Sequence, residues 1–171
     1  ANVGIFVSGD LDEHRIAELV AADAPVNGFG VGTRLGTSAD APFLNSAYKL
    51  VEYAGRPRMK LSSGKLTLPG RKQVFRVLEK SRAARDVLGL HDESVAGRPL
   101  LRTVMREGER LPGASPPLAE VCAYCAEELG TLSDALRDLE PPARPYPVEI
   151  SFGLAAERDH ALRQLEEHAP G

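Results

Sequence analysis

The chain has 171 residues, and 43% of them are hydrophobic, which is enough for one domain with a core of its own. A formal net charge of −3 argues against a general polyanion-binding protein, so no nucleic-acid partner is expected. Two cysteines cannot form a disulfide framework, and no apolar stretch approaches membrane-spanning length, so no membrane partner is expected either.

The first zone, residues 1–45, predicts a strand, a helix and a second strand, with a glycine turn after each strand. In chain order these are a strand at 4–7, a turn at 8–11, a helix at 12–23, a strand at 26–29 and a turn at 30–33. Asp12 is a suitable N-cap for the helix, and Pro25 ends it. In such a βαβ unit both turns lie at the carboxyl ends of parallel strands, where α/β proteins bind phosphate.

The start of the chain suggests that it is part of something larger. It begins at Ala1 without a basic segment followed by an apolar one, so we expect no signal peptide and a cytoplasmic location. Two parallel strands and one helix cannot bury a sheet that needs neighbours on both edges and helices on its faces. We therefore expect the first zone to be the end of a larger α/β unit, with sequence missing upstream.

The two glycine turns fit a monophosphate better than a dinucleotide. The residues after Gly28 do not have the G-x-G-x-x-G spacing, and no P-loop lysine follows. Glycine lets backbone N–H groups approach an anion closely, although tight-turn geometry alone would also explain either turn. Asp10 would repel a phosphate unless it faces a ribose diol or Mg²⁺; the alternative is an acidic residue that complements the helix dipole.

The second zone, residues 46–110, is expected to be rich in β-structure. Residues 48–61 predict a hairpin, 73–78 and 100–105 predict strands, and 82–90 fit either a strand or a loop. The zone carries a basic cluster within 24 residues: Lys49, Arg56, Arg58, Lys60, Lys65, Arg71 and Lys72. Such a cluster offsets the charge of a phosphate-rich ligand, or it is an ordinary solvated face of a hairpin.

The third zone, residues 111–171, is expected to be mostly helical. A helix that starts near Ser115 carries Cys122 and Cys125 on a face shared with leucines, so we assign both cysteines to the core. Residues 146–150 predict a short extended segment, followed by a last amphipathic helix at 155–168. The histidines show no metal-ligand spacing, and no nucleophilic triad can be argued.

Six segments form a specific set when they are taken together. They are Ser8-Gly9-Asp10-Leu11-Asp12-Glu13, Gly28-Phe29-Gly30-Val31-Gly32-Thr33, Tyr48-Lys49-Leu50-Val51-Glu52, Lys60-Leu61-Ser62-Ser63-Gly64-Lys65, Pro69-Gly70-Arg71-Lys72-Gln73-Val74-Phe75-Arg76 and Tyr146-Pro147-Val148-Glu149. These segments closely resemble the nicotinate phosphoribosyltransferase family. The resemblance covers most of the chain, and it is firmest over residues 4–76.

The resemblance implies an enzyme of NAD biosynthesis that joins nicotinate to phosphoribosyl pyrophosphate, giving nicotinate mononucleotide and pyrophosphate. ATP is implied as a co-substrate whose hydrolysis is coupled through a phosphorylated histidine. That histidine lies upstream in the family, so no catalytic residue is assigned here and the chain alone is expected to be inactive. The family builds its active site between two subunits, which implies a homodimer at full length.

The fold implied by the resemblance is α/β, an irregular barrel of the type II phosphoribosyltransferase kind. This chain would hold the carboxyl-terminal part. Residues 1–45 would supply the last strands of the phosphate-binding barrel, residues 46–110 a β-rich basic region, and residues 111–171 a C-terminal helical region.

The resemblance also implies roles for individual residues. The substrate 5′-phosphate would be bound by Gly9, Gly30, Gly32 and Thr33. Asp10 would contact the ribose hydroxyls or their Mg²⁺ ion, which is the implied cofactor. Pyrophosphate or the ATP phosphates would be bound by Lys49, Lys60 and Lys65.

Two other functions remain open from the residues themselves. A different phosphate-binding α/β barrel enzyme would share the two glycine turns but not the stretch from Lys49 to Arg76. A non-catalytic α/β binding module would share only the shape, and it should ignore nicotinate mononucleotide.

Overall fold

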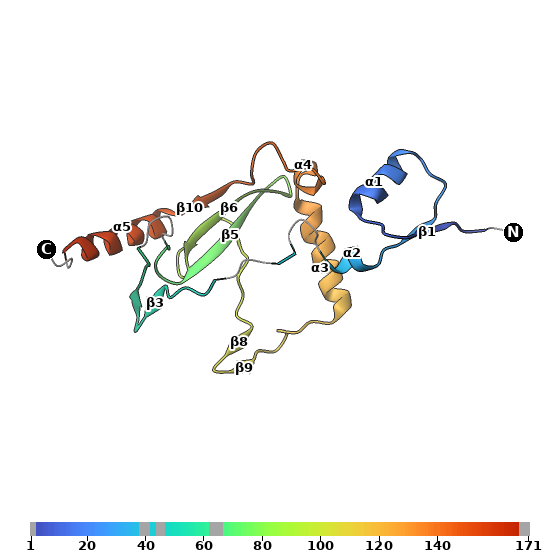
Figure 1. Cartoon of the computed structure of the whole chain (residues 1–171). Coiled ribbons are helices and arrows are strands. Elements are labelled where there is room, and N and C mark those ends of the chain that lie inside the picture. Colours follow the sequence, from blue (N-terminus) through green and yellow to red (C-terminus); the bar gives the residue numbers. More distant parts are fainter. Residues whose placement is uncertain (1–2, 38–41, 44–46, 62–66, 168–171) are drawn as a thin grey trace. The chain divides into compact units, whose positions relative to one another are not determined.

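The structure is a computed structural model that describes residues 3–37, 42–43, 47–61 and 67–167 (Figure 1). It divides into two compact units, Ala1–Ala47 and Tyr48–Gly171. The second unit contains most of the β-rich zone together with the helical zone. Each unit is described by itself below.

The first unit contains the predicted strand–helix–strand arrangement. Its elements are β1 (Phe6–Ser8), α1 (Glu13–Ala21), β2 (Gly28–Gly30) and the short helix α2 (Thr33–Gly36). β1 and β2 are parallel, with Ser8 opposite Gly30, so the expectation of parallel strands is confirmed. Asp12 caps α1 as predicted, because its Oδ1 accepts a hydrogen bond of 2.9 Å from the backbone N–H of Arg15.

The apolar residues of this unit are only partly covered. Leu11 is buried, but Ile5, Phe6 and Val20 are exposed, and Phe29 is half-buried. This incomplete burial is the outcome expected of a two-stranded parallel sheet that is accompanied by one nine-residue helix and one short helix.

The second unit is built on a four-stranded sheet with the order β10–β6–β5–β7. Its strands are β5 (Lys72–Glu79), β6 (Arg82–Leu90), β7 (Arg98–Pro99) and β10 (Val148–Ile150). β5 and β6 form an antiparallel hairpin, and β10 joins β6 in parallel. Residues 82–90, which fitted a strand or a loop, are therefore a strand. The extended segment predicted at 146–150 is confirmed in part by β10.

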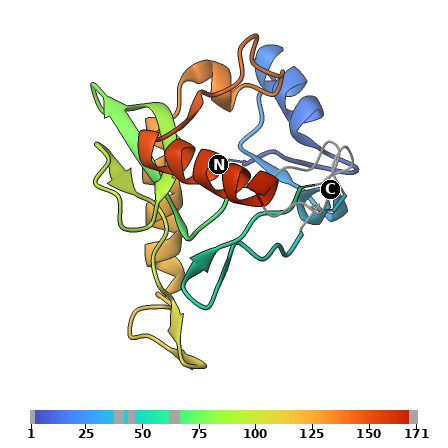
Figure 2. The ribbon, with the colours of Figure 1, turned by 90° about the vertical axis from the view of Figure 1, so that its left-hand side faces the viewer.

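Helices lie on both sides of the β5–β6 hairpin. α5 (Phe152–Glu167) follows β10 and contacts β6, and α3 (Leu118–Thr131) contacts β6 as well. Viewed from the α5 side in Figure 2, α5 lies in front of the strands and α3 lies behind them. Leu154 anchors α5 because it is fully buried, and its N–H donates to the Ser151 hydroxyl at 3.1 Å.

Two small hairpins and a short helix complete the described part of the second unit. The hairpins are β3 (Glu52–Tyr53) with β4 (Arg56–Pro57), and β8 (Met105–Arg106) with β9 (Glu109–Arg110); the helix is α4 (Asp134–Arg137). The β3–β4 pair confirms in part the hairpin predicted at 48–61, since only residues 52–53 and 56–57 are paired as strands. None of the described helices is long and apolar enough to span a membrane.

The strand predicted at 100–105 is wrong for most of its length. The β5–β7 ladder ends at Pro99. The side chain of Gln73 then binds both backbone groups of Leu101: its Oε1 accepts from the N–H at 2.8 Å, and its Nε2 donates to the carbonyl at 2.9 Å. A buried side-chain amide thus takes the place of a neighbouring strand, so the apolar residues that follow do not extend the sheet.

The assignment of Cys122 and Cys125 to the core is also wrong. Both are exposed free thiols on α3, and no described residue of that helix is buried. An ionic cluster near its carboxyl end connects the helix to the sheet. There Glu128 accepts hydrogen bonds from Arg98 at 2.7 Å and from Arg76 at 3.3 Å.

Candidate functional site

Both glycine turns line one cavity at the carboxyl ends of β1 and β2. The cavity has a volume of about 350 Å³. It is lined by Ser8, Gly9, Asp10, Leu11, Gly30, Gly32, Thr33 and Arg34. The list includes every residue that the sequence assigned to the 5′-phosphate and the ribose. The parallel pairing brings them together, because it places Ser8 directly opposite Gly30.

The backbone at this cavity is open toward solvent. Gly9 has φ +109° and Asp10 has φ +53°, which are left-handed values that strongly favour glycine at the first position. A Cβ atom added at Gly9 or at Gly32 would meet no described atom within 4 Å. The glycines therefore leave free space beside the backbone, into which an anion could enter and bind N–H groups.

The charges at the cavity come from two carboxylates and one guanidinium. Arg34 Nε donates to Asp10 Oδ1 at 3.2 Å, and Arg34 Nη1 donates to Asp12 Oδ2 at 3.3 Å. The hydrogen bond with Asp10 raises the pKa of Arg34. The N–H of Arg15, together with the charge of Arg34, lowers the pKa of Asp12. Arg34 and Asp12 are thus both held in their charged forms near neutral pH.

The sequence did not identify Arg34 as a site residue. It follows the Gly32-Thr33 turn directly, and a basic residue beside a candidate phosphate turn was the available signal. Its contacts reach residues 22 and 24 positions earlier in the chain, and only the pairing of β1 with β2 brings them close.

The predicted lysines belong to the second unit. Lys49 and Lys60 are exposed there, and the backbone of Lys60 is paired with Thr67, whose hydroxyl accepts from the Lys60 N–H at 2.7 Å. Lys65 lies outside the described residues. Their contact with pyrophosphate or ATP stays a prediction.

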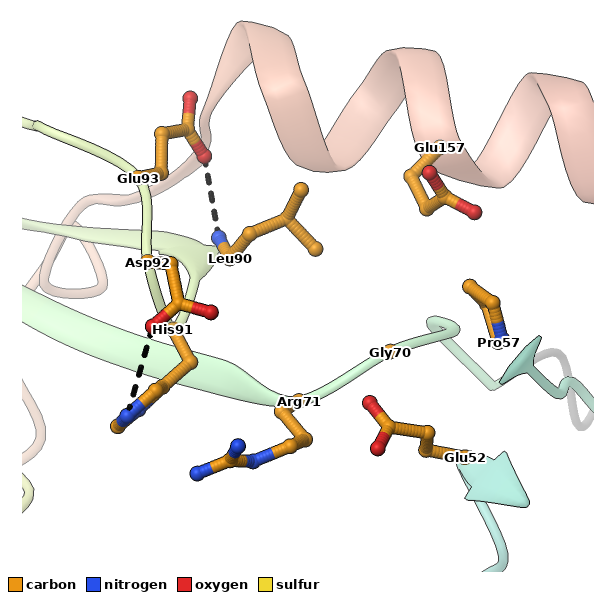
Figure 3. A pocket seen from close by; sticks show the side chains of 9 residues that line it. All are labelled: Glu52, Pro57, Gly70, Arg71, Leu90, His91, Asp92, Glu93 and Glu157. Atoms are coloured by element: carbon orange, nitrogen blue, oxygen red, sulfur yellow. Dashed lines mark hydrogen bonds and ion pairs between the residues drawn. The ribbon is translucent and has the colours of Figure 1, made fainter. Parts of the chain in front are cut away.

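A second cavity, of about 560 Å³, lies in the second unit between the β3–β4 hairpin, the end of β6 and α5 (Figure 3). Figure 3 shows the Glu52 and Glu157 carboxylates on opposite sides of it. Glu93 is used structurally, because it accepts hydrogen bonds from Leu90, Ser151 and Gly153. Within the described ranges no cluster of His, Cys, Asp and Glu could hold a metal ion.

Comparison with known proteins gives several strong matches. The chain is 46% identical over 155 residues to a Mycobacterium tuberculosis protein named nicotinate phosphoribosyltransferase pncB2, and the match covers 91% of this chain and 34% of that protein. It is 37% identical over 181 residues to the nicotinate phosphoribosyltransferase of Bos taurus, with 91% and 33% covered. The chain is related to nicotinate phosphoribosyltransferases. It spans about a third of the length of these relatives.

A solved structure agrees with the sequence matches. The crystal structure of human nicotinic acid phosphoribosyltransferase matches with a TM-score of 0.72 and 30% identity, over 94% of this chain and 33% of the human one. No protein-family model matches the chain. The resemblance to nicotinate phosphoribosyltransferases predicted from the sequence is confirmed, as is an α/β fold that corresponds to part of the larger enzyme.

Proposed function

We propose that this chain supplies the phosphate-binding and ribose-binding part of a nicotinate phosphoribosyltransferase. The reaction joins nicotinate to phosphoribosyl pyrophosphate in NAD biosynthesis, gives nicotinate mononucleotide and pyrophosphate, and uses ATP as a co-substrate. The observation that carries the proposal is the convergence of Gly9, Asp10, Gly30, Gly32 and Thr33 around one cavity. The relationship to enzymes of that name supports it.

In this proposal the residues of the cavity bind and orient the substrate. Backbone N–H groups at Gly9, Gly32 and Thr33 hold the 5′-phosphate, and Asp10 accepts hydrogen bonds from the ribose hydroxyls. Cleavage at the ribose C1 atom builds positive charge on the sugar and negative charge on the departing pyrophosphate. A fixed ribose keeps the reacting atoms aligned, and Lys49, Lys60 and Lys65 offset the charge of pyrophosphate or ATP.

The donor set at the cavity suits a magnesium ion that arrives with its substrate. Mg²⁺ commonly binds through one or two carboxylates together with substrate phosphates and water. Asp10 offers one carboxylate that is largely exposed, and the other carboxylate nearby, Asp12, already caps a helix. Asp10 would therefore hold the ion in the presence of phosphates, and Mg²⁺ would neutralise phosphate charge there.

The same proposal includes a homodimer and a cytoplasmic location, and both stay predictions. The two alternatives, another phosphate-binding barrel enzyme and a non-catalytic module, differ from it in ligand choice. A barrel enzyme of another kind would prefer another phosphate ester, and a binding module would ignore nicotinate mononucleotide.

The test uses a chimera in which this chain replaces the matching segment of the M. tuberculosis relative. In that context Gly32→Val should weaken the binding of nicotinate mononucleotide by about tenfold or more, because the side chain fills space that the phosphate needs. Calorimetry with nicotinate mononucleotide measures the affinity.

Gly36→Val is the matched control. Gly36 also has open space at its Cβ position, but it does not line the cavity. Its variant should bind within about twofold of the parent. Equal affinity of the parent, the Gly32 variant and the Gly36 variant would contradict the proposal that the 5′-phosphate binds beside Gly32.

A further inference from the structure

Arg34 joins the two turns of the candidate site. It lies in α2, directly after the Gly32-Thr33 turn, and its guanidinium contacts Asp10 of the turn after β1 at 3.2 Å and Asp12, the N-cap of α1, at 3.3 Å. Of the described residues that line the cavity, Arg34 is the one cation and Asp10 the one anion. Without the Arg34 side chain, the Asp10 carboxylate in the cavity wall would lose the positive charge beside it.

The two carboxylates differ in how firmly they are held. Asp12 is 19% exposed, and its Oδ1 is fixed by the first turn of α1, so its Oδ2 is a rigid anchor for Arg34. Asp10 is 74% exposed, and Arg34 is its hydrogen-bonded partner among the described residues. Arg34 is thus fixed by the bond from its Nη1 to Asp12, and its Nε holds the exposed Asp10 carboxylate.

This arrangement resolves a conflict inside the proposed site. A phosphate dianion and the Asp10 carboxylate repel each other in one small cavity, and the repulsion grows as a ligand displaces water. An arginine can satisfy both carboxylates at once because its planar fork carries donors in fixed directions, whereas lysine is a point charge on a flexible stem.

We infer that Arg34 is a positioning residue that orients Asp10 toward the ribose and offsets its negative charge, so that a phosphate monoester can bind beside it. This role rests on the proposed function. It acts through Asp10, without a direct contact between Arg34 and the phosphate. The effect of removing Arg34 should therefore depend on whether Asp10 carries a charge.

A double-mutant cycle in the same chimera tests this dependence. Arg34→Gln should weaken the binding of nicotinate mononucleotide by about tenfold when Asp10 is present. In the Asp10→Asn background, which keeps the shape but removes the charge, the same change should alter affinity by less than about twofold. Arg34→Lys keeps the charge but cannot contact both acids, so it should bind about threefold more weakly than the parent.

Arg15→Gln is the control, because it removes one positive charge from the same unit at an exposed position outside the cavity lining. It should leave the affinity within about twofold. Thermal unfolding shows whether each variant folds, and Arg34→Lys provides the test if Arg34→Gln does not.

Three results would overturn the inference. Arg34→Gln or Arg34→Lys could bind as the parent does. Arg34→Gln could cost as much in the Asp10→Asn background as it does with Asp10 present, which would mean that the guanidinium binds the phosphate directly. Failure of the folded parent to bind nicotinate mononucleotide would overturn the proposed function as well, whereas the first two results leave that function intact.

Discussion

Gly97 occupies a position in the second unit where a side chain would be crowded and the backbone strained. Its backbone has φ +137°, and a Cβ atom added there would lie 3.0 Å from the carbonyl oxygen of Arg76 and 3.2 Å from the Cβ of Phe75. Gly97 immediately precedes β7, which pairs with β5 at these two residues. The glycine therefore permits β7, the edge strand, to approach β5 closely.

We expect Gly97→Ala to lower the free energy of unfolding of the second unit by roughly 1–3 kcal/mol, since backbone atoms must move and the φ angle is strained. Urea denaturation of the chain measures the change. Gly130→Ala is the matched control, because it lies within α3 with no described atom within 4 Å of its Cβ position. It should be neutral or slightly stabilising. Equal losses in the two variants would contradict the argument.

The residues of the candidate site were predictable to different degrees. Gly9 and Gly32 could be found because glycine after an apolar run marks a special backbone conformation in the sequence itself. Asp12 could be found as an N-cap because capping is a local interaction. For Arg34 the sequence offered only its place beside the Gly32-Thr33 turn, because its contacts with Asp10 and Asp12 depend on strand pairing.

At the scale of elements, an ionic cluster connects the sheet to α3 and to the segment before β10. Arg76 on β5 forms two hydrogen bonds with Asp86 on β6, at 2.9 and 3.0 Å, and also reaches Glu128 on α3. The Tyr146 hydroxyl donates to Asp86 at 3.0 Å, and the Arg76 guanidinium lies over its ring. Removing one partner from a largely buried group of charges of this kind strongly destabilises the folded state.

The hydrogen bonds from Arg76, and then from Tyr146, outweigh burial and lower the pKa of Asp86 below its usual value of 3.8. Because the folded pKa is depressed, the stabilisation is present above about pH 3.8 and is lost as the pH falls through the lower, folded value. Asp86→Asn should lower the free energy of unfolding by about 3 kcal/mol near neutral pH. It should also make that free energy depend less on pH in the acid range.

Urea unfolding between pH 2 and pH 7 measures both effects. Asp92→Asn is the control, because the Asp92 side chain is 91% exposed. It should change stability by less than about 0.5 kcal/mol at neutral pH. An acid profile that is the same for the Asp86 variant and the parent would show that Asp86 does not contribute to it.

Elements with a strong local pattern were predicted correctly, whereas the end of the sheet at β7 and the exposure of α3 depend on contacts that a local pattern does not show. The β1–α1–β2 order and the β3–β4 hairpin follow from alternation, turn residues and capping. The side chain of Gln73, far away in sequence, ends the sheet at Pro99. The periodicity of α3 predicts an apolar face, but periodicity does not show what covers that face.

At the scale of the whole molecule, apolar surface remains exposed in both units. Ile5, Phe6 and Val20 are exposed in the first unit, and Leu118 and Tyr124 are exposed on α3. The related proteins are about three times as long as the matched segment. We expect the part of those proteins outside this segment to supply the cover for such faces and the groups that react.

The 171-residue chain alone should therefore form no nicotinate mononucleotide. The cavity proposed for phosphate and ribose has no described histidine in its lining, and His14, His91 and His160 are exposed. The purified chain is incubated with nicotinate, phosphoribosyl pyrophosphate, ATP and Mg²⁺, and the product is separated by chromatography.

The chimera with the M. tuberculosis relative is the positive control and should form the product, while its Gly32→Val variant should form less of it. Light scattering should show self-association of the isolated chain, because its apolar faces are uncovered. Sustained, ATP-stimulated product formation by the isolated chain would show that the catalytic groups lie within these 171 residues after all.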